Sequence, residues 1–115
     1  MDNLIRKFRI YNEKFKTDEG YLFYNTETEQ FSMKLLPEYK GYADIFFKEL
    51  NKQGVIDVPQ HLVDMWVRGR VIPPNRQGMR GILDDLGMKE YNVFDLLVYG
   101  NGRCQMDYSC IIEEK

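Results

Sequence analysis

The 115-residue chain has little of what builds a metal site or a disulfide. It contains one histidine and two cysteines, Cys104 and Cys110. Neither a CxxC nor an HxxxH spacing occurs, so these residues form a poor set of metal ligands. If the last segment is an extended strand, the two thiols lie about 20 Å apart, far beyond disulfide distance. We therefore expect no metal, no cofactor and two free thiols, as is usual in a reducing cytoplasmic compartment.

The chain also lacks long apolar runs and an excess of charge of one sign. No segment approaches the roughly 18 apolar residues of a membrane helix, and the charged start MDNLIRKFRIYNEKF does not resemble a signal peptide. The formal net charge is −2. Because nucleic-acid binders usually carry a basic excess, this balance disfavours nucleic acid as a partner. The 43% of hydrophobic residues is typical of one globular domain, residues 1–115.

The common catalytic patterns are missing as well. There is no glycine-rich phosphate loop, no GxSxG elbow and no HxxEH zinc motif. His61 and Asp64 could touch on one helix, but that face is polar and is expected to be solvated. The acidic pairs Asp84–Asp85 and Glu113–Glu114 are adjacent residues whose side chains diverge, and we expect Asp84 to pair with Arg80 instead. We predict no catalytic residue and a function that is not enzymatic.

The first forty residues have the two-residue period of half-buried strands. The segments KFRIY and YLFY are predicted strands. In QFSMKLL, the side chains of Phe31, Met33 and Leu35 lie on one face. The polar segments TDEG and NTETE are predicted turns, and Pro37 is expected to end the third strand.

From residue 42 onward, three stretches carry an apolar stripe with helical spacing. We expect Gly54 and Gly87 to end the first and third helices. Pro59 suits the first turn of the second helix, and Asn75 is a plausible N-cap of the third. The stripes consist of Ala43, Phe46, Phe47 and Leu50; of Leu62, Val63, Trp66 and Val67; and of Met79, Ile82, Leu83 and Leu86.

The last quarter of the chain is less regular. YNVFDLLVYG could be a buried strand, but Asn92 followed by Asp95 resembles the start of a helix, so we prefer a short helix. The alternation in CQMDYSCIIEE predicts a final strand. The order of elements indicates an α+β fold, in which N-terminal strands and one C-terminal strand form a small antiparallel sheet with three to four short helices.

One stretch, WVRGRVIPPNRQGMRG, is unusually rich in residues found at protein interfaces. It holds the only tryptophan and four of the seven arginines. Arginine forms forked hydrogen bonds with carboxylates and phosphates, and both residue types are enriched at binding hot spots. The alternative is that the tryptophan belongs to the core and the arginines are solvated. The candidate partner-binding residues are Trp66, Arg68, Arg70, Pro73, Asn75, Arg76 and Arg80.

The segment IPPNRQGMRGILDDLGMKEYNVFDLLVYGNGRC resembles the N-terminal subdomain of HipA-type toxin kinases. In that family an LLP loop precedes an arginine-bearing helix, an LG pair and a pattern like DPFALLAALGRDCAGAL. The counterparts here are Ile72–Pro73, Leu86–Gly87, residues 93–97 and residues 100–104. GYLFYNTETEQFSMKLLPEY resembles the family's hairpin, so the similarity covers roughly residues 18 to 112. The family's small-residue run is QMDYS here, and the segment 41–67 is longer and more helical than usual.

The resemblance implies a binding protein without a kinase body, since the chain has no catalytic-loop HxD motif followed by Asn. Some HipA-type systems are split, and a small separate protein that matches the subdomain binds the kinase and restrains it as an antitoxin. Two alternatives remain open: a binding or inhibitor protein of mobile-element origin with another target, and a weak nucleic-acid-associated regulator. The outer strands of so small a sheet could also pair with a second copy of the chain.

Overall fold

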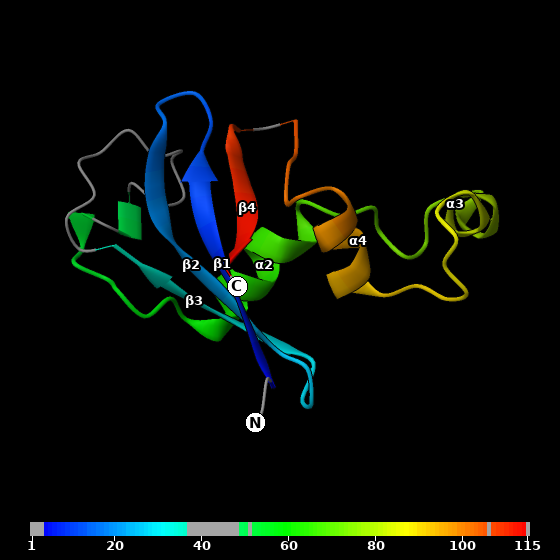
Figure 1. Cartoon of the computed structure of the whole chain (residues 1–115), viewed down its shortest axis with the longest axis horizontal. Helices are drawn as coiled ribbons and strands as arrows, with labels where there is room; N and C mark the ends of the chain where they lie inside the picture. The colour runs from blue at the N-terminus through cyan, green and yellow to red at the C-terminus, as the bar shows by residue number, and fades with distance from the viewer. Residues whose placement is uncertain (1–3, 37–48, 51, 106, 115) are drawn as a thin grey trace.

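Four antiparallel strands form one sheet with the order β3-β2-β1-β4 in a computed structural model of the chain (Figure 1). The structure describes residues 4–36, 49–50, 52–105 and 107–114. The strands are β1 (Ile5–Asn12), β2 (Thr17–Asn25), β3 (Gln30–Leu35) and β4 (Ser109–Glu114), and the described helices are α2 (Gln60–Arg68), α3 (Met79–Asp85) and α4 (Val93–Tyr99). The predicted α+β fold, with N-terminal strands joined by one C-terminal strand, is therefore confirmed.

The core lies between one face of the sheet and the helices α2 and α4. Phe8 and Ile10 of β1 alternate with half-buried or exposed residues, as a strand with one covered face requires. Val63, Trp66 and Val67 are the buried residues of α2, on the stripe that the helical period predicts. Sheet and helices contribute to one buried cluster: Phe8, Ile10, Leu22, Tyr24, Phe31, Met33, Leu35, Leu50, Val58, Val63, Trp66, Val67, Phe94, Leu97 and Ile111.

The two hairpin turns are built alike. In the β1–β2 turn, the backbone N–H of Lys16 donates to the Asn12 carbonyl at 2.7 Å, and Lys16 has a φ of 57°. In the β2–β3 turn, the N–H of Glu29 donates to the Asn25 carbonyl at 2.8 Å, and Glu29 has a φ of 58°. In each turn the Oδ1 atom of the asparagine accepts two further backbone N–H groups. Both turns therefore place a charged residue in the left-handed region that glycine prefers.

Most predicted helix ends are confirmed. Gly87 has a φ of +74°, and the N–H of Met88 donates to the Leu83 carbonyl at 2.8 Å, as in a Schellman cap. Gly54 also has a positive φ, and the N–H of Val55 donates to the Leu50 carbonyl at 3.0 Å. The ambiguous segment before residue 100 is a helix, α4, and the Asn92 side chain accepts the N–H of Asp95 at its start. The predicted stripe residues Ala43, Phe46 and Phe47, and Pro37, lie outside the described residues.

Three predicted boundaries are wrong. TDEG is not a turn but the start of β2, where the strand register shifts opposite Ile10 and Tyr11. Asn75 does not cap α3, because two successive turns follow the prolines and Gly78 occupies the N-cap position. The last strand begins at Ser109 rather than near Cys104, since the described residues 104, 105, 107 and 108 belong to no strand.

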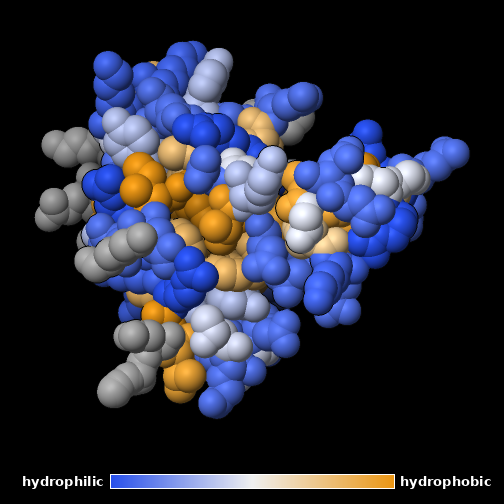
Figure 2. Space-filling view, turned by 45° about the vertical axis from the view of Figure 1, so that its right-hand side comes forward, coloured by the Kyte–Doolittle hydropathy of each residue, from blue (hydrophilic) through white to orange (hydrophobic). Residues whose placement is uncertain are grey.

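The chain between α2 and α4 projects from the sheet as an arm, here defined as residues 73–90. Its helix, α3, lies apart from the other elements (Figure 1), and the space-filling view shows a lobe separated from the body by a notch (Figure 2). Tyr91 donates its hydroxyl to the Ile72 carbonyl at 2.6 Å, which joins the two ends of the arm at its base. Among the described helices, none has the length and hydropathy needed to cross a membrane.

Candidate functional site

The structure divides the predicted partner-binding residues into a buried and an exposed group. Trp66 is only 5% exposed and belongs to the core cluster. The Arg70 side chain is 3% exposed. These two side chains therefore lie inside the fold. For Trp66 this is the alternative stated above, in which the tryptophan belongs to the core.

Arg70 joins the end of α2 to the loop that precedes β4. Its guanidinium lies 3.9 Å from the centre of the Trp66 ring and forms an ion pair with the Asp107 carboxylate at 2.5 Å. It also donates to the Gly102 carbonyl at 2.9 Å and lies 3.4 Å from the Cys104 sulfur. A guanidinium has five N–H donors in a planar fork, so one arginine can hold several chain segments at once. Arg70 thus stabilises the body from which the arm projects.

The other predicted residues are exposed. Pro73, Asn75 and Arg76 lie at the start of the arm. Arg80 is also exposed, but it pairs with Asp84 at 2.9 Å, as predicted, and donates to backbone carbonyls beyond α3. Arg80 therefore fixes the shape of the arm, whereas the Arg76 guanidinium makes no hydrogen bond or ion pair with another described residue.

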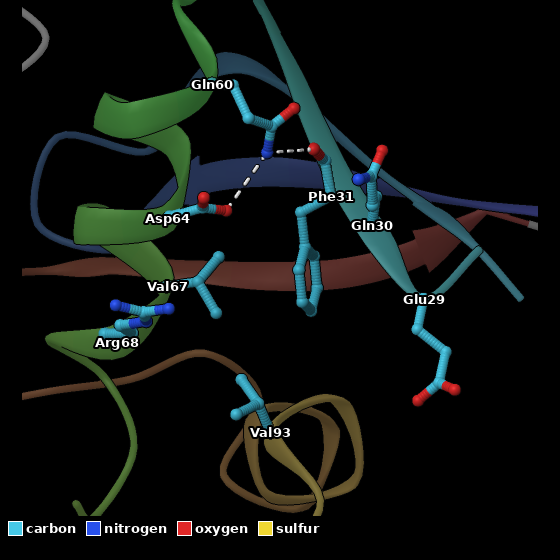
Figure 3. Close-up of a pocket in the computed structure, with 8 residues that line it drawn as sticks. All are labelled: Glu29, Gln30, Phe31, Gln60, Asp64, Val67, Arg68 and Val93. Atoms are coloured by element: carbon cyan, nitrogen blue, oxygen red, sulfur yellow. Dashed lines mark hydrogen bonds between the residues drawn. The ribbon is translucent and has the colours of Figure 1, made fainter.

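Arg68, the remaining member of the set, lines a groove between α2 and the edge strand β3. The groove has a volume of about 270 Å³. Gln60 closes one end, because its Nε2 atom donates to the Phe31 carbonyl at 2.8 Å and to Asp64 at 3.0 Å. Figure 3 shows Arg68 and Glu29 on opposite sides of the cavity, with Phe31 and Val67 between them. The lining residues are Glu29, Gln30, Phe31, Gln60, Asp64, Val67, Arg68 and Val93.

A second hollow of about 240 Å³ shares Glu29, Phe31 and Val93 with the first and extends toward Tyr24 and Tyr91. Burial raises the pKa of both tyrosines above the ordinary value of 10.0. The negative charge of Glu29 raises the pKa of Tyr24 further, while the positive charge of Arg68 acts in the opposite direction on Tyr91. Glu29 and Arg68 therefore influence the ionisation of Tyr24 and Tyr91, respectively.

Sequence reasoning found Arg68 but missed the rest of the groove. Glu29 was assigned to a polar hairpin loop and Asp64 to a solvated helix face, and Gln60 was given no role. One signal was available: α2 places residues 60, 64, 67 and 68 on one side, at helical spacing. No local pattern indicates that this side faces the tip of the β2–β3 hairpin.

Neither metal binding nor disulfide formation is indicated by the described residues. No group of three His, Cys, Asp or Glu side chains in that part of the chain could hold an ion. Cys104 and Cys110 are both free thiols in the structure, and Cys110 is buried. Burial is the largest influence on Cys110 and raises the pKa of its thiol above 9.0, so this thiol is a poor nucleophile.

Comparison with models of protein families, with curated proteins and with solved structures found no match. The function must therefore be inferred from the chain's own residues. These residues provide a projecting arm and a groove with both polar and apolar lining, in which Glu29, Asp64 and Arg68 carry charge. Such an arrangement can bind and orient another molecule.

Proposed function

We propose that the chain is a non-catalytic protein-binding module that contacts its partner through the arm and the adjoining groove. The observation that carries this proposal is the projection of residues 73–90 from a well-packed sheet domain. Binding residues commonly lie on connecting segments that a rigid scaffold positions. Here the scaffold includes Arg70, whose ion pair and hydrogen bonds fix the base of the arm.

The exposed residues of the arm suit protein recognition. Arg76 has no described partner to release before it binds, and arginine is enriched at binding hot spots. Pro73 and Pro74 restrict the backbone in front of it, which lowers the entropy lost when the arm is ordered by a partner. Arg68 lines the groove and precedes the arm by five residues in the chain.

The partner that the sequence resemblance supports is a HipA-type kinase, which the chain would bind as an antitoxin-like subunit. The resemblance covers the arm itself, from Ile72–Pro73 to Leu86–Gly87. The exposed Arg76 guanidinium can bind an acidic group, which is compatible with a protein partner. Binding to a protein other than a kinase is the competing outcome.

The test is calorimetric titration of the purified chain with a HipA-type kinase from the same cells. We expect saturable binding, and the double variant Arg68→Ala/Arg76→Ala should weaken it at least about tenfold. Lys52→Ala is the matched control, because this exposed cation lies outside both the arm and the groove. Unchanged affinity in the double variant would refute the arm as the contact surface, and the absence of any binding would refute the kinase as the partner.

A further inference from the structure

Three charged residues line the groove: the Asp64 carboxylate accepts a hydrogen bond from Gln60, whereas Glu29 and Arg68 have opposite charges that do not meet. The Glu29 carboxylate and the Arg68 guanidinium both line it, yet neither makes a hydrogen bond or ion pair with another described residue. Figure 3 shows them on opposite sides of the cavity. Charges so placed are complementary to a ligand that carries one group of each sign, separated by the width of the groove.

The lining between these charges is partly apolar and partly polar. Phe31 and Val67 are buried members of the core cluster that present only small surfaces to the groove, Val93 lies on the side toward α4, and Gln30 and Gln60 contribute amide groups. A volume of about 270 Å³ is enough for one large aliphatic side chain together with part of its backbone. A groove of this size accommodates a short peptide segment rather than a whole folded surface.

The backbone strain at Glu29 belongs to the turn geometry that the two hairpins share. Its φ of 58° lies in the left-handed region, where a residue with a Cβ is strained and glycine is not. Lys16 occupies the equivalent place in the other hairpin turn with a φ of 57°, but it is not among the residues that line the groove. The two positions share the backbone strain, and only Glu29 combines it with a place at the groove.

We propose that the groove binds an extended peptide segment of a protein partner in which an aliphatic residue is flanked by one basic and one acidic residue. The basic side chain meets Glu29, the acidic side chain meets Arg68, and the aliphatic side chain packs on Phe31 and Val67. This inference rests on the proposed protein-binding function and specifies the part of a partner that the groove recognises. It does not depend on the partner being a kinase.

The experiment follows backbone amide signals of the ¹⁵N-labelled chain during titration with two peptides, acetyl-Ala-Lys-Leu-Glu-Ala-amide and acetyl-Ala-Glu-Leu-Lys-Ala-amide. One order of charges should shift the signals of Phe31, Val67 and Val93 with a Kd in the low millimolar range, about the value expected for one small half-open site. A peptide with glutamine in place of both charged residues should bind about tenfold more weakly.

Glu29→Gly and Lys16→Gly are the matched pair of variants. Both replace a strained residue with glycine in the same kind of turn, so both should raise the melting temperature by a few degrees. Only Glu29→Gly should weaken peptide binding, by about three- to tenfold. Replacing the peptide's lysine with glutamine should then cause no further loss in this variant, which identifies the pair of groups that interact. Arg68→Gln should show the same pattern against the peptide's glutamate.

Equal binding of the charged and the glutamine peptide, or wild-type affinity in Glu29→Gly, would overturn the inference. So would the absence of any shift at groove residues with either peptide. Because the peptides contain no kinase sequence, these outcomes leave the kinase titration unaffected. Conversely, peptide binding in the expected pattern without kinase binding would support the groove as a peptide site and refute the kinase as the partner.

Discussion

Replacing Arg70 should destabilise the fold far more than replacing any other arginine of the arm region. Its side chain is 3% exposed and its partner Asp107 is 14% exposed, so the ion pair is shielded from solvent. Removal of one member of such a pair leaves a buried charge without its partner and typically costs about 3–5 kcal/mol. That is a large part of the about 5–15 kcal/mol by which a domain is usually stable.

The assay is urea unfolding followed by circular dichroism. Arg70→Ala should lower the unfolding midpoint by about 2 M, given an m-value of about 1–3 kcal/mol/M. Arg70→Lys keeps the charge but loses the planar fork, and it should still cost about 1–3 kcal/mol. Arg76→Ala is the control, and its free energy of unfolding should stay within about 0.5 kcal/mol of the wild type.

A double variant separates the ion pair from the packing around it. Arg70→Met/Asp107→Leu removes both charges together, and it should be more stable than Arg70→Ala because no unpaired charge is left behind. A loss of less than about 1 kcal/mol in Arg70→Ala would refute the structural role assigned to this residue. It would also return Arg70 to the group of candidate contact residues.

Three further predictions concern stability and reactivity. Trp66→Ala should cost about 3–5 kcal/mol in the same urea assay, since the indole is a core residue; a variant with wild-type stability would contradict its burial. Asn92→Ala should cost about 1 kcal/mol through loss of the α4 cap, whereas an unchanged midpoint would show that the cap is dispensable. The folded-state pKa values of Cys110, Tyr24 and Tyr91 are raised by burial. The stability that they contribute is therefore present below pH 9.0 and is lost as the pH rises through the raised values. Unfolding measured at pH 8 and at about pH 10.5 should show this loss, and a free energy that rises over the interval would contradict it.

The elements that could be predicted from the sequence are those set by local period. Apolar residues at helical spacing gave α2 and α3, and two-residue alternation gave β1 and β3, because each pattern reports which face is buried. Asn92 was recognised as a cap because the capping bond spans only three residues. Such features depend only on residues that are close together in the chain, so one sequence is enough to predict them.

The polar residues of the interior could not be predicted in this way. Glu19 was assigned to a turn, yet it is 1% exposed and accepts a hydrogen bond from Ser109, 90 residues away. Arg70 was assigned to a contact surface, yet its partner Asp107 lies 37 residues along the chain. A buried charge requires partners that folding brings together from distant segments. The groove escaped prediction for the same reason, since Glu29 and Arg68 belong to different elements.

The central claim is that the arm and groove, rather than the buried Trp66–Arg70 pair, contact a protein partner. Hydrogen exchange of the chain, measured alone and with a HipA-type kinase from the same cells, tests this claim most directly. The account predicts slower exchange in residues 73–90 and at the start of β3 when the kinase is present, and unchanged exchange in β1 and β4. Protection confined to β1 and β4, or no change anywhere in the chain at saturating kinase, would contradict it.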